Sequence, residues 1–187
     1  MSIVRGTPSL LPPPDGFEYF EEMLSTDEEQ ALVAAIQALE LKPFDFQGYQ
    51  AKRQVKSFGW RYDYGDYSLK QSDEIPAFLT AVREKAAEFA GLAPNKLVQA
   101  LVTEYTPGTP IGWHRDRSVF DEVIGISLLS SCTFRFRRKV GTKWERHNLT
   151  LEPRSIYILR GPARTEWEHS IPEVTELRYS ITFRTLK

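Results

Sequence analysis

Two segments in the first half of the chain repeat their apolar residues at helical spacing. In residues 25–41, Leu32, Ile36 and Leu39 fall on one face, and a hydroxyl at position 25 or 26 with a glutamate at position 28 or 29 can form a capping box. Residues 74–92 repeat the pattern, with Pro76 in the first turn and Gly91 at the end. We therefore expect two helices that each bury one apolar side.

The second half of the chain changes to short segments that are rich in β-branched and aromatic residues. Proline, glycine or charged residues separate these segments, and no helical pattern lies between them. The predicted strands are residues 96–105, 123–129, 132–138, 146–152, 155–161, 166–171 and 176–186. Because helices do not alternate with the strands, the pattern predicts an α+β, mainly β protein, in which two helices pack outside an antiparallel sandwich or barrel.

Length and composition limit the class of protein. With 187 residues, of which 41% are hydrophobic and 26% charged, the chain fits a single globular domain. No apolar run approaches the roughly 20 residues that span a bilayer, and residues 1–16 lack the apolar stretch of a secretory signal. The single cysteine, Cys132, excludes an intramolecular disulfide, and we expect it to be a small buried side chain. We expect a cytoplasmic monomer without membrane contact.

Charge is distributed unevenly along the chain. The net charge is −1, so the molecule as a whole gives no electrostatic argument for binding nucleic acid. Residues 135–146, however, carry six basic side chains against Glu145 alone, and basic and aromatic residues alternate in 49–64. Such patches can hold phosphates and stack on bases, or they can be the solvated faces of edge strands. Composition alone leaves both interpretations open.

A histidine and an aspartate in the segment IGWHRDRS have the spacing of a metal site. On an extended segment, His114 and Asp116 point the same way and can bind one ion. Of the two other histidines, His147 lies in the most basic region, which we expect to be exposed, so His169 is the better third ligand. Two histidines and a carboxylate suit non-haem Fe(II) oxygenases. The alternative is an ordinary hydrogen-bonded imidazole beside a turn carboxylate.

The last predicted strand has one apolar and one polar face. Its polar face carries Arg178, Ser180, Thr182 and Arg184. If this face lies inside a barrel, the arginines need an anion, and a dicarboxylate co-substrate would supply one. If it lies outside, it is simply solvated. Six residues of strand span about 20 Å, so both arginines reach one small ligand only if the strand bends, or if one of them acts indirectly by pairing with Asp116.

Taken together, these segments resemble the AlkB family of Fe(II)- and 2-oxoglutarate-dependent dioxygenases. The resemblance rests on YTPGTPIGWHRD (105–116), HSIP (169–172) and RYSITFR (178–184), and RQVKSFGWRYDYG (53–65) is similar to the family's substrate-recognition lid. It extends over nearly the whole chain. It implies a double-stranded β-helix (a jelly roll) in residues 97–187, preceded in residues 1–96 by an extension that carries the helices and the lid.

The resemblance also implies roles for individual residues. The iron ligands would be His114, Asp116 and His169. Five residues would serve 2-oxoglutarate: Arg178 and Tyr105 at the distal carboxylate, Arg184 near the other carboxylate, and Thr103 and Ser180 beside them. The substrate would be held by Trp60 and Tyr62, which grip a flipped base, and by Arg135 and Arg137, which hold the backbone.

The chain departs from the family pattern at three places. Thr103 stands where the family has asparagine, Ser118 where some relatives have an acidic residue, and Arg53 or its neighbours where a stacking tryptophan is known. We expect an enzyme that uses Fe(II), 2-oxoglutarate and O₂ to dealkylate N-alkylated bases in DNA or RNA, releasing formaldehyde and succinate. One alternative is the same chemistry on a protein side chain, a tRNA nucleoside or a small molecule. Another is a non-catalytic binding barrel.

Overall fold

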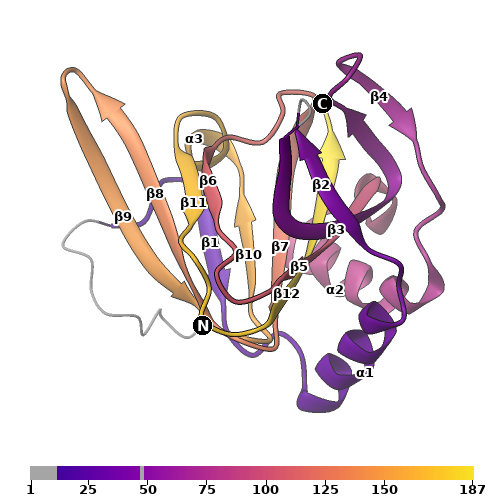
Figure 1. The fold of residues 1–187 in the computed structure, drawn as a ribbon. Coiled ribbons are helices and arrows are strands. Elements are labelled where there is room, and N and C mark those ends of the chain that lie inside the picture. Colours follow the sequence, from indigo (N-terminus) through magenta and orange to yellow (C-terminus); the bar gives the residue numbers. More distant parts are fainter. Residues whose placement is uncertain (1–11, 47–48) are drawn as a thin grey trace.

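The computed structural model describes residues 12–46 and 49–187, which form two antiparallel sheets packed face to face (Figure 1). The larger sheet has the order β1 (Phe17–Phe20), β10 (Ile156–Leu159), β7 (Phe120–Leu128), β12 (Arg178–Leu186), β5 (Gln99–Tyr105), β3 (Tyr49–Asp63) and β2 (Lys42–Phe46), with β4 (Ser68–Gln71) paired to β3. The smaller sheet has the order β6 (Ile111–His114), β11 (Glu168–Ile171), β8 (Cys132–Val140) and β9 (Lys143–Leu151). The expected mainly β sandwich is confirmed.

Both predicted helices are present, and their ends follow the capping signals. In α1 (Thr26–Gln37), the Glu28 amide donates to the Ser25 hydroxyl at 3.2 Å, and the Ser25 amide donates to the Glu28 carboxylate at 2.8 Å. A 3₁₀ turn, η1 (Ala77–Leu79), leads into α2 (Thr80–Ala90), which ends at Gly91 with φ 69°. A second 3₁₀ turn, η2 (Pro94–Lys96), connects α2 to β5.

The helices cover one face of the larger sheet and leave the other face to the site (Figure 1). The first apolar core joins the helices to this sheet; on β12 it takes Tyr179, Ile181 and Phe183. A second core, with Phe134 and Phe136 of β8 at its centre, fills the space between the two sheets. The polar residues of β12 therefore point between the sheets and not into solvent, which decides the alternative left open by the sequence.

Several elements were not predicted from the apolar pattern. Strands β1 to β4 lie in the first half of the chain, and the short helix α3 (Gly161–Thr165) separates β10 from β11. Within β3, Gly59 has φ 75°, and a Cβ there would lie 2.1 Å from the carbonyl oxygen of Val98. At this point β3 stops pairing with β5 and begins to pair with β4. Cys132 is buried, as expected.

No helix in the described part of the chain is long and apolar enough to cross a bilayer. The expectation that the first residues carry no secretory signal falls largely on residues 1–11, which lie outside the described residues.

Candidate active site

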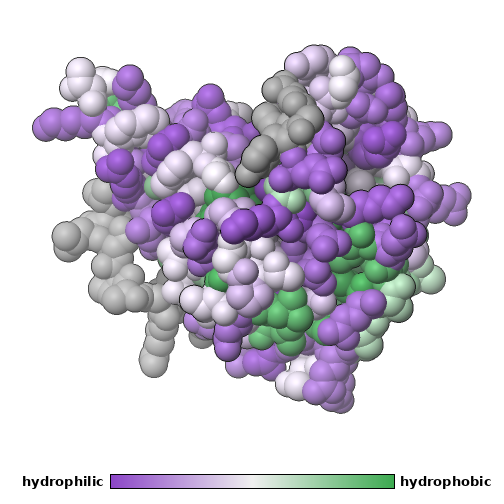
Figure 2. All heavy atoms as spheres, in the orientation of Figure 1, coloured by the Kyte–Doolittle hydropathy of each residue, from purple (hydrophilic) through white to green (hydrophobic). Residues whose placement is uncertain are grey.

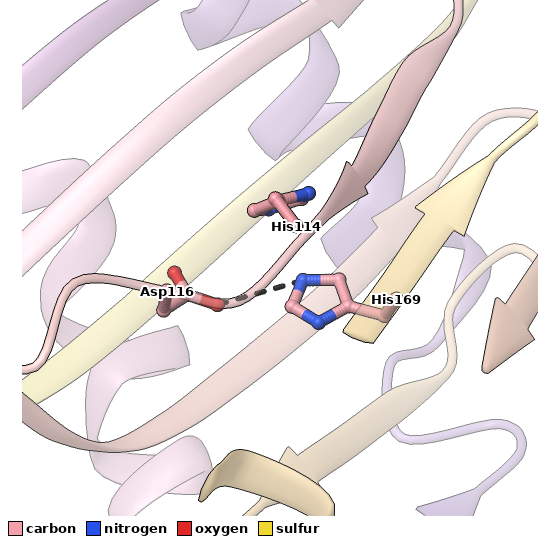
Figure 3. Close-up of side chains that lie close together, drawn as sticks. All are labelled: His114, Asp116 and His169. Carbon is pink, nitrogen blue, oxygen red and sulfur yellow. Dashed lines mark ion pairs between the residues drawn. The ribbon is translucent and has the colours of Figure 1, made fainter. Parts of the chain in front are cut away.

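The pairing of two short strands brings the three expected metal ligands together. His114 ends β6 and lies directly opposite His169 of β11 in the strand register, and their ring centroids are 4.3 Å apart. Asp116 follows two residues after β6, so the chain turns its carboxylate back toward both rings (Figure 3). One ligand atom from each residue lies within 4.8 Å of the others. Residues 53 positions apart in the sequence thus form one cluster.

The hydrogen bonds and burial of the two imidazoles prepare them to bind a metal. Nδ1 of His114 lies 2.9 Å from the carbonyl oxygen of Gly112, which can only accept, so Nδ1 is the donor and Nε2 is the nitrogen left to coordinate a metal. Burial and the neighbouring His114 lower the pKa of His169 to about 3. For His169 this favours the neutral ring, which is the protonation state that coordinates a metal.

Asp116 is held by an arginine from the larger sheet. Nη2 of Arg184 lies 2.7 Å and its Nε 2.9 Å from Oδ1 of Asp116, while Nη1 donates to Oε1 of Gln99 at 3.0 Å. The other carboxylate oxygen, Oδ2, lies 3.5 Å from Nε2 of His169. Burial alone would raise the pKa of Asp116, but Arg184 and the two histidines hold it well below its usual range. The ligand is therefore an oriented carboxylate.

This donor set fits Fe(II). Two neutral imidazoles and one carboxylate on one side of an ion leave positions on the other side for a co-substrate and O₂. His147 is not part of the cluster, and our expectation that it is exposed is wrong: only 8% of its surface is accessible. Its neighbours Arg146 and Asn148 are exposed, but His147 lies opposite Phe136 in the register and shares the inner face of the sheet.

A second group of polar residues lies beside the metal cluster and suits a dicarboxylate. Arg178 is 1% exposed; its Nε donates to the Ser127 hydroxyl at 3.2 Å, and its guanidinium lies 4.8 Å from the ring centroid of Tyr105. Its Nη1 is buried without a hydrogen-bond partner. The hydroxyls of Tyr105 and Ser180 are 3.3 Å apart, and Thr103 is also buried on this wall. An unsatisfied buried guanidinium beside hydroxyls fits one carboxylate of 2-oxoglutarate.

One cavity of about 1440 Å³ connects these residues to β2 and to β3, the strand on which the sequence predicts the lid. Pockets for a single small ligand hold roughly 300–1,000 Å³, so this cavity has room for a co-substrate and part of a second molecule. The lid lines it with Tyr62 and Tyr64 of the β3 end, and Arg117 lies over both rings. Trp60 is half-buried, pairs with Gln71 of β4, and is not among the described residues that line the cavity.

The two remaining expected substrate residues lie on the outer face of the smaller sheet. Arg135 and Arg137 lie 5.0 Å and 4.5 Å from the ring of Trp113, and Arg137 is also 4.4 Å from the ring of Trp144. Arg137 forms an ion pair with Glu168, and Nε of Arg135 donates to the hydroxyl of Ser170. Trp113 and Glu168 line the cavity, so this arginine–tryptophan stack begins at its rim.

Three residues of the site were missed in the sequence. Gln99 orients Arg184, and Ser127 accepts from Arg178. Arg164 of α3 donates to the carbonyl oxygens of Arg117 and Phe120 at 2.6 Å and 2.8 Å, which fixes the loop after Asp116. Ser127 is a lone hydroxyl inside the apolar segment 123–129, and this could have indicated a buried polar contact. Nothing in the local pattern indicated that Arg164 is buried.

Known proteins resemble this chain both in sequence and in fold. The family model of the 2OG-Fe(II) oxygenase superfamily matches residues 16–184. A protein of Arabidopsis thaliana called "Alkylated DNA repair protein ALKBH8 homolog" is 30% identical over 181 residues, which cover 84% of this chain and 51% of that protein. The mouse "tRNA (carboxymethyluridine(34)-5-O)-methyltransferase ALKBH8" is 29% identical over 164 residues, 84% of this chain and 24% of that protein. The chain thus spans about half or less of these two relatives.

Two solved structures share the fold. OsALKBH1 superposes with a TM-score of 0.72 at 16% identity, covering 95% of this chain and all of the other. A prolyl-4-hydroxylase of Pseudomonas putida gives a TM-score of 0.61, also at 16% identity, covering 92% and 93%. The sandwich is therefore the double-stranded β-helix of these oxygenases. Because the family model covers nearly the whole chain, the chain belongs to the 2OG-Fe(II) oxygenase superfamily, and its resemblance to the AlkB family is confirmed.

Proposed function

We propose that this dioxygenase hydroxylates an alkyl carbon carried by a nucleobase in DNA or RNA. The observation that carries the proposal is a cavity that is lined both by the His114–Asp116–His169 cluster and by the aromatic and cationic residues of β2 and β3. With iron bound, one atom of O₂ enters a C–H bond of the substrate, while the other enters 2-oxoglutarate as it is converted to succinate and CO₂. When the carbon is attached to nitrogen, the hydroxylated product releases formaldehyde and the dealkylated base.

The residues of the chain bind, orient and shield the reactants. Arg178 would hold the distal carboxylate of 2-oxoglutarate, with Tyr105, Ser180 and Thr103 beside it, because its unpartnered Nη1 gains a charge-assisted hydrogen bond there. Arg184 keeps the Asp116 carboxylate ionised and oriented. Apolar groups of Val123 and Phe134 complete the wall and exclude water from the reacting carbon.

The β8–β9 hairpin is the second support for a nucleic-acid substrate. It projects from the body of the protein, and its surface is mostly hydrophilic (Figures 1 and 2). Arg135 and Arg137 of the hairpin stack on Trp113 of β6, and Arg137 also stacks on Trp144. The stack offers both positive charge and flat rings, which are the two requirements for holding a phosphate backbone and unstacked bases. A base in a duplex would have to flip out to reach the metal cluster.

The same hydroxylation on a tRNA nucleoside is a second candidate. The mouse relative is named for tRNA and carboxymethyluridine, although this chain spans only 24% of it. If the alkyl carbon is attached to a ring carbon of the base, the hydroxylated product is stable and no formaldehyde forms. The two candidates thus share every residue of the metal and co-substrate sites and differ only in the atom to which the alkyl group is attached.

Succinate formation with Fe(II), ascorbate and 2-oxoglutarate tests the proposal when it is measured with and without oligonucleotides. We expect stimulated turnover by a modified oligonucleotide, with a mass loss of one CH₂ unit for N-demethylation or a gain of one oxygen atom for stable hydroxylation. Arg135→Gln should weaken binding of the oligonucleotide. It should also reduce the slope of the logarithm of the binding constant against the logarithm of the salt concentration by about 1. Lys96→Gln, an exposed charge change outside the cavity lining, is the matched control. Turnover that no DNA or RNA stimulates would contradict the proposal.

A further inference from the structure

The backbone that carries Asp116 belongs to no strand. β6 ends at His114 and β7 begins at Phe120, so pairing between strands does not fix residues 115–119. Arg184 holds the tip of the Asp116 side chain, but the carboxylate still turns if the backbone behind it moves. The position of this metal ligand therefore depends on what holds the loop.

The short helix α3 holds the chain on both sides of the metal-binding aspartate. On one side, Nη1 of Arg115 donates to the carbonyl oxygen of Thr165 at 3.2 Å. On the other side, Nη2 of Arg164 donates to the carbonyl oxygens of Arg117 and Phe120 at 2.6 Å and 2.8 Å. β11, which carries the third metal ligand, begins two residues after α3 ends. One helix thus connects the aspartate loop to the strand of the distal histidine.

Arg164 is an unfavourable side chain for a buried position. It is 6% exposed, its Nε has no hydrogen-bond partner, and within residues 12–46 and 49–187 it forms no ion pair. Burial lowers its pKa below the ordinary arginine value, and Asp116 is the carboxylate that most opposes this effect. A methionine would fill a similar space without burying a charge. Since departures of this kind concentrate at functional sites, we expect the two carbonyl contacts to serve more than stability.

The side chain of Arg117 reaches the aromatic wall of the cavity. Its guanidinium carbon lies 5.1 Å from the ring centroid of Tyr62 and 4.6 Å from that of Tyr64. Tyr64 contacts Tyr62 and Phe44 edge to face, with centroids 5.1 Å and 5.7 Å apart. Arg53 stacks on the ring of Phe44 at 4.0 Å, and all five residues line the cavity. Arg117 is therefore held by α3 through its carbonyl oxygen and contacts the wall through its guanidinium.

We propose that Arg164 is a positioning residue, which sets the place of Asp116 relative to His169 and, through Arg117, the place of the aromatic wall relative to both. The metal end and the substrate end of the cavity then share one support. A metal binds most tightly when its ligand atoms are already in place, so a loop that shifts lowers the affinity. Because these contacts concern the metal ligands and the wall, whatever the substrate, their failure would leave the proposed function standing.

Mn(II) titration by calorimetry, without oxygen and at a temperature where every variant is folded, tests the metal end. Arg164→Met keeps the length of the side chain but removes its donors, and it should lower the Mn(II) affinity about tenfold, the lower end of the range for indirect partners of a metal. Arg164→Lys should restore part of the affinity, since an ammonium still donates to carbonyl oxygens. Arg115→Ala, a change at an exposed residue, should lower it about twofold, the size of one weak hydrogen bond.

Arg160→Met is the matched control. Arg160 caps the first turn of α3, donates to the carbonyl oxygen of Ala90 at 3.0 Å, and is not among the described residues that line the cavity. Its loss should leave the Mn(II) affinity unchanged. Urea denaturation of the metal-free variants measures stability separately. If Arg164→Met lowers the urea midpoint but binds Mn(II) like Arg160→Met, the role of Arg164 is purely structural and the proposal is overturned.

Arg117→Met separates the two ends of the support. It removes the guanidinium from the wall but keeps the carbonyl oxygen that Arg164 holds, so the Mn(II) affinity should remain. Amide hydrogen exchange of residues 60–64, followed by mass spectrometry, should become about fivefold faster, the effect of losing one cation–π contact. Arg164→Met should show both the faster exchange and the weaker metal binding. Exchange at the wild-type rate in both variants would overturn the connection to the wall.

Discussion

Arg184 and Asp116 form a bifurcated contact in which two guanidinium nitrogens lie 2.7 Å and 2.9 Å from one carboxylate oxygen. The contact occupies Oδ1 and leaves Oδ2 toward His169. Of the two arginines on β12, Arg184 therefore acts on a metal ligand, and Arg178 at the other end faces the co-substrate wall. Six residues of strand separate the two arginines by too great a distance for both to bind one small molecule. In this geometry they need not, because each has a different partner.

Arg184→Gln should lower metal affinity by about ten- to a hundredfold, the usual effect of losing a hydrogen-bond partner of a metal ligand. The variant leaves the buried Asp116 without its cation, so the carboxylate is neither oriented nor held ionised. Mn(II) titration by calorimetry under anaerobic conditions measures the loss. Arg178→Gln serves as the comparison, since it should keep Mn(II) binding and weaken 2-oxoglutarate; equal Mn(II) losses in both variants would contradict this division of roles.

Arg178→Met should abolish the stabilisation that 2-oxoglutarate gives to the folded protein. In the wild type, saturating co-substrate raises the melting temperature by mass action, and the contact depends on the buried, unpartnered Nη1. Without ligand, the variant should be about as stable as the wild type or more stable, because methionine removes a buried cation. Differential scanning fluorimetry with and without 2-oxoglutarate checks both statements. An undiminished ligand shift would place the carboxylate elsewhere.

The alternation of side chains predicted the polar wall on β12, but it did not predict which residues at the end of β3 line the cavity. On β12 the strict period of two separates Tyr179, Ile181 and Phe183 from the polar residues, and the structure follows it without a break over 178–184. On β3, Trp60 and Tyr62 have the same place in the alternation, yet only Tyr62 lines the cavity, as do its neighbours Arg61 and Asp63. These residues lie where β3 passes from pairing with β5 to pairing with β4, and a period of two cannot tell Trp60 from Tyr62 there.

Contacts between distant elements were the other limit. The apolar patterns of α1 and α2 predicted both helices because the relevant forces act within one segment. The stacks of Arg53 on Phe44 and of Arg117 on Tyr64 depend on how β2, β3 and the loop after Asp116 meet, which no local pattern specifies. The prediction that His147 is exposed was wrong for a related reason. Its charged neighbours indicated exposure, although its position in the alternation of side chains placed it on the inner face.

Asp116→Ala should abolish metal-dependent succinate formation, since two histidines alone hold Fe(II) poorly.

His147→Ala tests whether the right third histidine was assigned, but because His147 is buried, the change should also lower the melting temperature. Metal stoichiometry is therefore the better measurement: one Mn(II) per folded chain is expected for His147→Ala, and none for His169→Ala. A normal stoichiometry in His169→Ala would show that the third ligand was chosen wrongly.

Gly125→Ala should both destabilise the protein and disturb its co-substrate wall. Gly125 lies opposite Tyr157 between β7 and β10, and a Cβ there would fall 2.2 Å from the tyrosine ring. Because Tyr157 lines the cavity, the ring can give way only toward the ligands or by moving β10. Overpacking of this kind costs about 1–3 kcal/mol, measurable by urea denaturation, and 2-oxoglutarate should bind more weakly. Gly112→Ala, where no atom lies within 4 Å of the added Cβ, should change stability by about 0.5 kcal/mol or less; equal losses would mean that the backbone, and not the Tyr157 contact, requires glycine.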